Sequence, residues 1–154
     1  MKVIKATNSL DDIEQLKEAV FEWRDSCNGK DFGIDLQTET FFSHLVDMIN
    51  DEDKELFLLV KMDKVIGFLG AVIFQSPLGV QNIAIERFWF VSGKHRGRGA
   101  ILLYRAFKKW AKEKGCSHHL MTASCLASDM HDRLCRFYEK IGFRKFETSY
   151  IKEL

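Results

Sequence analysis

The sequence lacks any apolar run long enough to cross a membrane. Its longest runs, such as 56–60 and 65–74, are well below the roughly 18 residues that a spanning helix needs. The first residues, 1–6, also lack the apolar segment and the small-residue cleavage site of a secretory signal. We therefore expect a cytoplasmic protein that makes no membrane contact.

The cysteines do not form a pattern typical of a disulfide framework or a zinc site. There are four of them, with no C-x-x-C pair and no secretory context: Cys27, Cys116, Cys125 and Cys135. Buried thiols explain them better, and we expect no metal site.

Repeats, low-complexity segments and linkers are also absent. The 154 residues are 46% hydrophobic and 29% charged, which is a normal balance for a globular protein. A chain of this length buries about 70% of its unfolded surface around one core. We predict a single domain over residues 1–154.

The net charge is only +1, but it is unevenly distributed. Residues 93–116 hold eight basic residues and one acid, whereas the rest of the chain holds 15 basic and 21 acidic residues. This favours one anion site over general nucleic-acid binding, which is a rival interpretation of the basic segment. Four of its lysines are better explained as the solvated face of a helix: Lys108, Lys109, Lys112 and Lys114.

The spacing of apolar residues predicts an α+β fold. Helical periodicity marks 10–24, a second helix around 42–49, 99–114, and a helix between a Ser128 cap and Gly142. Strand patterns mark 3–6, 55–62, 65–75, 81–91, 118–124 and 143–154. Short connectors predict an antiparallel meander, and the crossover helix makes the fourth and fifth strands parallel.

The fourth predicted strand carries an acid on a largely apolar face. Simple alternation puts Glu86 on the same side as Ala84, Phe88 and Phe90. Burial there would raise the pKa of Glu86 towards neutrality, which suits a general base. The alternative, equally open, is that Glu86 pairs with a basic residue on a neighbouring strand or with solvent.

After this strand comes a glycine-rich basic turn and then a helix. Such a turn collects free backbone N–H groups and the positive end of a helix dipole at one point, which favours phosphate binding. Gly97 and Gly99 allow close approach, and Arg96 and Arg98 add charged donors. The turn lacks the Lys-Ser/Thr of a P-loop and the spacing of a dinucleotide fingerprint.

The segment Arg96-Gly97-Arg98-Gly99-Ala100-Ile101 resembles the acyl-CoA-binding motif of the GNAT superfamily, Arg/Gln-x-x-Gly-x-Gly/Ala, with Ile101 where the family has a small residue. Residues 136–143, Arg-Phe-Tyr-Glu-Lys-Ile-Gly-Phe, resemble its closing motif, Tyr-Glu-Lys-x-Gly-Phe. Residues 147–154 are similar to the ends of GNAT proteins encoded by tailed bacteriophages, which suggests a bacterial or phage setting and the host cytoplasm.

The resemblance implies a GNAT-like fold: a mixed, mostly antiparallel sheet of six to seven strands flanked by four helices, with strands four and five parallel and splayed. It implies that residues 96–100 hold the cofactor pyrophosphate and that Phe90 and Val91 pair with the pantetheine arm. His131 stands where the family often has an Asn that binds cofactor or water.

Two catalytic roles follow from the same resemblance. Tyr138 would give a proton to the departing CoA thiolate, although it could instead be core packing beside Phe137. Glu86 would be the general base, with His95, His131 and Asp129 as weaker candidates.

We therefore predict transfer of an acyl group, most simply acetyl, from acyl-CoA to a primary amine on a small molecule or peptide. The amine attacks directly in a ternary complex, so no covalent enzyme intermediate is needed. The alternative is a catalytically degenerate interaction module with weak or no CoA binding, which Ile101 and His131 favour. A homodimer stays open.

Overall fold

The computed structural model describes residues 1–7, 9–126 and 129–154. The elements follow one another as β1 (Lys2–Lys5), α1 (Leu10–Ser26), the 3-10 turn η1 (Gly29–Phe32), α2 (Thr38–Ile49), β2 (Lys54–Lys61), β3 (Lys64–Gln75), β4 (Asn82–Val91), the 3-10 turn η2 (Gly93–His95), α3 (Arg98–Glu113), β5 (His118–Leu120) and α4 (His131–Lys140).

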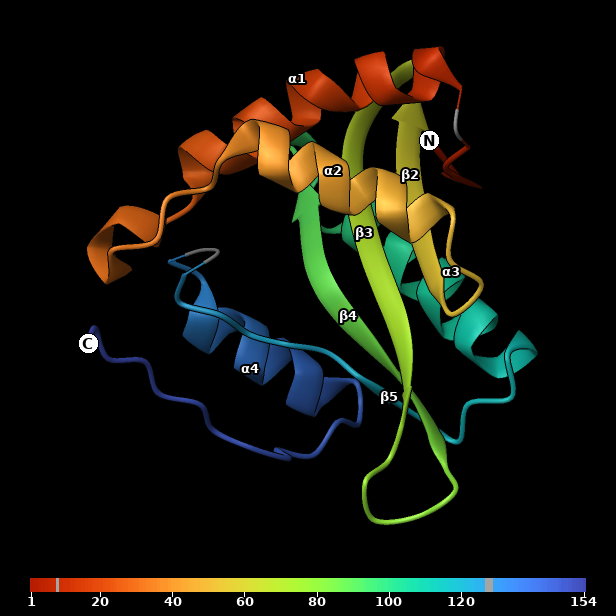
Figure 1. The fold of residues 1–154 in the computed structure, drawn as a ribbon, viewed down its shortest axis with the longest axis vertical. Coiled ribbons are helices and arrows are strands. Elements are labelled where there is room, and N and C mark those ends of the chain that lie inside the picture. The colour runs from red at the N-terminus through yellow and green to blue at the C-terminus, as the bar shows by residue number, and fades with distance from the viewer. Residues whose placement is uncertain (8, 127–128) are drawn as a thin grey trace.

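The described strands form one mixed sheet in the order β1-β2-β3-β4-β5. The first four are antiparallel neighbours, and β4 and β5 are parallel, which confirms the α+β arrangement. In Figure 1, α1 and α2 cover one face of the sheet, α3 lies behind the other face, and α4 lies beside β4. None of the helices in the described ranges is long and apolar enough to cross a membrane.

The predicted count of six to seven strands is wrong for the described residues, which form five. Residues 143–154 have no strand assignment, and β5 is three residues long instead of the seven expected for 118–124. Alternation predicts a strand only where a neighbour completes its hydrogen bonds, and in this tail Phe146 and Tyr150 are exposed. Ser128, the expected cap of α4, lies outside the described residues.

Two hydrophobic clusters hold the layers together. On the α1 and α2 face, the aromatic rings of Trp23, Phe41, Phe68 and Phe88 pack with centroids 4.8–6.2 Å apart. On the other face, buried side chains of α3, which include Leu103, Phe107 and Trp110, pack against the sheet. Burying each such side chain stabilises the fold by about 1.5–3 kcal/mol.

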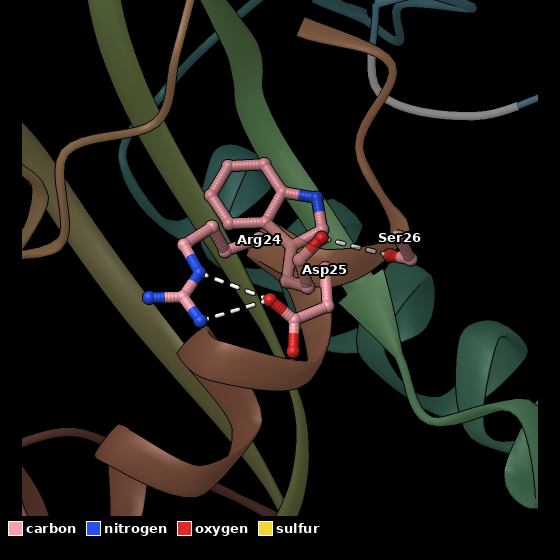
Figure 2. A network of polar contacts seen from close by, with 4 residues as sticks. Arg24, Asp25 and Ser26 are labelled. Carbon is pink, nitrogen blue, oxygen red and sulfur yellow. Dashed lines mark hydrogen bonds and ion pairs between the residues drawn. The ribbon is translucent and has the colours of Figure 1, made fainter. Parts of the chain in front are cut away.

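Hydrogen bonds hold the last turn of α1, which contributes Trp23 to the aromatic cluster. Ser26 Oγ donates a hydrogen bond of 2.8 Å to the carbonyl oxygen of Trp23, as Figure 2 shows. Next to it, Arg24 donates from both Nε and Nη2 to one oxygen of Asp25, at 3.0 and 2.9 Å. These bonds occupy backbone and side-chain groups at the helix terminus, where intrahelical partners run out.

A bulge in β4 corrects the face predicted for Glu86. Along β3, Gly70 pairs with Phe88 and the next residue, Ala71, pairs with Glu86, so Arg87 has no partner on β3. Phe88 and Phe90 therefore pack on the α1 and α2 side, whereas Ala84 and Ala71 belong to the α3 cluster. Since directly paired residues share a face, Glu86 lies on the α3 side with Ala71.

Candidate active site

The site begins where β4 and β5 part. The two strands pair only from Ile83 to Ile85 of β4, although β4 continues to Val91. We call the edge of β4 from Glu86 to Val91 that faces away from β3 the open edge, because no strand of the described residues pairs with it. This matches the parallel, splayed pair implied by the GNAT resemblance.

The direction of the backbone amides along the open edge follows from one hydrogen bond. Ser92 N donates to Ile66 O on β3 at 2.9 Å, and amides on a strand alternate between its two edges. The amides of Trp89 and Val91 therefore point to the open edge, whereas that of Phe90 points towards β3. The Phe90 side chain is buried in the aromatic cluster.

Glu86 is the one charged residue in the buried set of the described residues, with 5% of its surface exposed. Its Oε2 accepts a hydrogen bond of 3.1 Å from Thr122 N, which lies just beyond β5. Burial raises its pKa from the ordinary 4.5 to about 7, against smaller lowering effects from that bond and from Arg87. None of the ion pairs formed by the described residues includes Glu86, so the predicted alternative of a salt-bridged carboxylate is not found.

Tyr138 approaches the same place from α4. Its hydroxyl donates a hydrogen bond of 3.2 Å to Thr122 O, and its ring is buried against Phe137 and Phe143. Burial, followed by the charges of Glu86 and Cys135, holds the pKa of Tyr138 above its usual value. The ring of Tyr138 therefore packs in the core. Its hydroxyl lies at the hydrogen-bonded contact between Glu86 on β4 and Thr122 after β5.

The glycine-rich turn leads from β4 into α3. Gly97 has φ +83° and precedes the first helical residue, Arg98, and Ile101 N donates to Gly97 O at 3.1 Å. The preceding amides of the first turn, at Arg98, Gly99 and Ala100, have no carbonyl within the helix to bind. They are available to an external anion, and the helix dipole favours negative charge there.

The two glycines of this turn have different reasons to be glycine. At Gly97 a side chain would be strained by the positive φ, although nothing lies within 4 Å of the place of its Cβ. At Gly99 a Cβ would lie 2.6 Å from Leu59 Cδ2 and 3.2 Å from Val91 Cγ1. Gly97 shapes the turn, whereas Gly99 lets α3 lie against the sheet.

The two arginines of the turn also differ, in what their side chains contact. Arg96 turns back along the chain: Nε donates to Val91 O at 3.3 Å, and Nη1 lies 4.0 Å from Met130 Sδ next to α4. Arg98 is exposed at the first position of α3. Arg96 therefore spans the open edge of β4 and the start of α4, while Arg98 is free to meet solvent or a ligand.

The face of α4 that carries Tyr138 also carries His131 and Cys135. His131 Nδ1 lies 2.9 Å from Asp132 Oδ1, and its Nε2 lies 3.8 Å from Cys135 Sγ. Sequence reasoning missed Cys135. The spacing of residues 131, 135 and 138 at i, i+4 and i+7 was the available signal.

Two of the other candidate bases, Asp129 and His131, line a hollow of about 280 Å³ together with Asn28, Asp31, Phe32 and Cys125. Asn28 Nδ2 donates to Asp129 Oδ1 at 2.6 Å and to Cys125 O at 3.2 Å, so it ties the segment after α1 to the segment before α4. His95 does not line the hollow; it is half-buried in η2. No group of three or more metal-ligating side chains occurs within the described ranges.

A mixed sheet whose parallel pair separates beside a glycine-rich turn and a helix N-terminus has the architecture of the GNAT acetyltransferases. The model of the acetyltransferase (GNAT) family matches residues 17–143, and the chain belongs to this family.

Solved structures agree with this fold. BH1408 from Bacillus halodurans, as a tetramutant, has a TM-score of 0.79 at 18% identity, with 100% of both chains covered. A ribosomal-protein-alanine N-acetyltransferase from Brucella melitensis has 0.72 at 16%, again covering 100% of both. AAC(6')-Iy in complex with the bisubstrate analogue CoA-S-monomethyl-acetylneamine has 0.74 at 15%, covering 99% of this chain and 97% of that one. No curated protein sequence matches the chain.

Proposed function

We propose that this chain is an acyl-CoA-dependent N-acyltransferase, acting as a single cytoplasmic domain, that moves an acetyl group from acetyl-CoA to a primary amine. The observation that carries the proposal is the meeting of Glu86 and Tyr138 at Thr122, beside the open edge of β4. A buried carboxyl with a pKa near neutrality and a buried phenol are the acid-base pair that amide formation from a thioester needs.

The residues of the turn fit an acyl-CoA. The outward amides of Trp89 and Val91 suit pairing with the amides of an extended pantetheine arm, and the first turn of α3 suits a pyrophosphate. Arg96 and Arg98 supply positive charge at the same corner. When bound, the cofactor supplies an activated acyl thioester.

Glu86 acts as the general base. An amine attacks a thioester only in its neutral form, so one proton must leave the acceptor, directly or through a water. With a pKa of about 7, the Glu86 carboxylate is both populated at neutral pH and basic enough to take that proton. Its bond from Thr122 N fixes the carboxylate towards the segment beyond β5.

Tyr138 and Val91 act on the leaving sulfur and the carbonyl oxygen. Because its pKa is raised, Tyr138 keeps its proton at neutral pH and can donate it, or a hydrogen bond, to a developing thiolate. The outward amide of Val91 donates to the developing oxyanion, which leaves the outward amide of Trp89 to pair with the pantetheine arm. Both groups are fixed by the fold before substrate binds.

The acceptor is an amine on a small molecule or a peptide. Structural neighbours carry names of both kinds, a ribosomal-protein-alanine N-acetyltransferase and an enzyme bound to a neamine analogue. The hollow beside His131 is lined by Asp31 and Asp129, a composition that favours a cationic amine.

The test is release of free CoA thiol from acetyl-CoA across amino acids, polyamines, aminoglycosides and peptide N-termini. Wild type should turn over at least one class, and Glu86→Gln and Tyr138→Phe should each slow that turnover by about 10²-fold. Glu139→Gln and Tyr104→Phe are matched controls, since Glu139 is exposed and Tyr104 bonds His119 instead. If calorimetry finds no binding of acetyl-CoA, the degenerate interaction module is the correct interpretation.

A further inference from the structure

One face of α4 carries a thiol that the proposed function does not use. His131, Cys135 and Tyr138 are spaced four and three residues apart, so they form one stripe along the helix. Tyr138 is the last residue of this stripe, and its hydroxyl bonds Thr122, the residue whose amide bonds Glu86. Cys135 is half-buried one turn earlier, and its charge acts on the pKa of Tyr138. The thiol therefore lies along the side of α4 that faces the proposed reaction centre.

The surroundings of Cys135 are those of an activated nucleophile. Its Sγ lies 3.8 Å from His131 Nε2, and the opposite ring nitrogen, Nδ1, lies 2.9 Å from Asp132 Oδ1. With the ring proton on Nδ1 and donated to Asp132, Nε2 is free to accept the proton of the thiol. A nucleophile, a base and a third group that orients the base is the arrangement used for acyl transfer by thiols.

The other cysteines lack this arrangement. In the described part of the chain, Cys135 is the one cysteine whose sulfur has a histidine nitrogen within hydrogen-bonding distance. Burial raises the pKa of Cys27 and Cys116, which makes their thiolates scarcer. Cys125 is exposed beside the hollow. Reactivity towards acyl donors should therefore concentrate at residue 135.

We propose that Cys135 is an acyl-accepting thiol, which takes the acyl group of bound acyl-CoA when no amine is present. The Cys135 sulfur attacks the thioester carbonyl carbon, a new C–S bond forms there, and the C–S bond to CoA breaks. His131 takes the thiol proton at Nε2 and returns it to the departing CoA sulfur. One thioester replaces another, so no oxidant, reductant or energy source is required.

This inference rests on the proposed function, because the same bound acyl-CoA is the donor. It adds a modification site that the direct ternary mechanism does not need. The product, an S-acyl group on α4, would lie one turn from Tyr138. The protein would then hold an acyl group covalently between encounters with an acceptor.

The first experiment measures the thiol without any acyl-CoA. The full chain is treated with limiting iodoacetamide at neutral pH, and the four cysteines are followed by peptide mass spectrometry. Cys135 should react first, and His131→Asn should slow it by about tenfold or more, since general-base assistance is lost. The same substitution should leave the rate at Cys116 unchanged, because Cys116 lies against α3.

The second experiment incubates the chain with acetyl-CoA alone and records intact and peptide masses. Wild type should gain one acetyl group at Cys135 that neutral hydroxylamine removes, as it removes thioesters but not amides. Cys135→Ala should abolish the label and Cys116→Ala should keep it. Calorimetry with acetyl-CoA is run on every variant.

The outcomes separate the two proposals. Binding of acetyl-CoA without a hydroxylamine-sensitive label at Cys135 overturns this inference and leaves the proposed function standing. Labelling that is indifferent to His131→Asn overturns it as well, because a thiol reacting unaided needs no such site. Absence of acetyl-CoA binding in wild type overturns both.

Discussion

Glu86 on β4 and Tyr138 on α4 are bonded to the same residue, Thr122, the first through its amide at 3.1 Å and the second through its carbonyl at 3.2 Å. Two elements far apart in sequence are thereby joined through the segment that follows β5.

The pH dependence of turnover should report Glu86. With a pKa of about 7, its ionised form grows through neutrality, so kcat/KM should rise with pH and level off above that value. Glu86→Gln should lower kcat/KM by roughly 10²-fold or more and remove the rise. A profile of Glu86→Gln that keeps the same inflection would assign it to another group, and Glu139→Gln provides the control.

Stability should depend on pH through the same residue. The pKa of Glu86 is raised on folding, so its contribution is fully present below about 4.5 and is lost as pH rises through about 7. Glu86→Gln removes this loss while keeping an acceptor for Thr122 N. The free energy of unfolding of the variant, relative to wild type, should thus increase by up to about 3 kcal/mol from acid to mildly alkaline pH. Urea denaturation at both ends of the range measures this, and parallel curves would refute the buried ionisation.

Tyr138→Phe should separate chemistry from packing. The ring stays in place, so unfolding should be easier by only about 1 kcal/mol, the usual loss for one hydrogen bond. Turnover should fall by about 10²-fold with little change in KM if the hydroxyl serves the leaving sulfur. Tyr104→Phe also loses a hydroxyl contact, to His119 Nε2 at 3.2 Å, and should turn over normally.

Replacing each glycine of the turn by alanine should have a different main effect, on stability for Gly99 and on acetyl-CoA binding for Gly97. Gly99→Ala forces a Cβ against Leu59 and Val91 in the α3 interface, which should destabilise the fold by about 1–3 kcal/mol. Gly97→Ala meets no atom within 4 Å but is strained by its φ of +83°, which should cost about 1 kcal/mol and weaken acetyl-CoA binding. Thermal melting and calorimetry on both variants give the comparison. Equal melting losses with unchanged affinities would contradict it.

Arg96→Ala should raise the Kd for acetyl-CoA about tenfold, as expected from losing a charged hydrogen bond to a phosphate. The melting temperature should change little, because Arg96 is exposed and its protein contacts, to Val91 O and Met130 Sδ, are long. Arg105→Ala removes an exposed arginine further along α3 and should leave the Kd unaltered.

The order of elements and the parallel β4–β5 pair could be predicted because they depend on local signals: apolar periodicity, glycine stops and short connectors. The burial of Glu86 could be predicted as one of two open alternatives, but its neighbours could not, since the bulge puts Phe88 and Phe90 on the other face. Its partner, Thr122, could not, because that contact joins residues 36 positions apart through a segment without regular structure. Cys135 was missed although its helical spacing from His131 and Tyr138 is visible in the sequence, because such spacing fits a packing residue as well as it fits a reactive thiol.

The tail illustrates the opposite error. Residues 143–154 alternate in the way a strand does, and strand alternation is a statement about one chain only. Whether such a segment becomes a strand depends on a neighbour with free backbone groups at the right distance. Among the described residues β5 pairs only with β4 and is three residues long, so its other edge offers the tail a ladder of only three residues.

The unpaired Arg87 has a consequence for how this chain can tolerate change. Deleting that single residue would leave Glu86 next to Phe88 in regular alternation, with each residue of β4 still opposite the same partner on β3 and on the same face of the sheet. With Arg87 present but not bulged out, strict alternation would instead put the carboxyl on the face of Trp23 and Phe88, away from Ala71. The bulge, and not the number of residues in β4, therefore keeps the proposed chemistry on the face opposite the aromatic cluster.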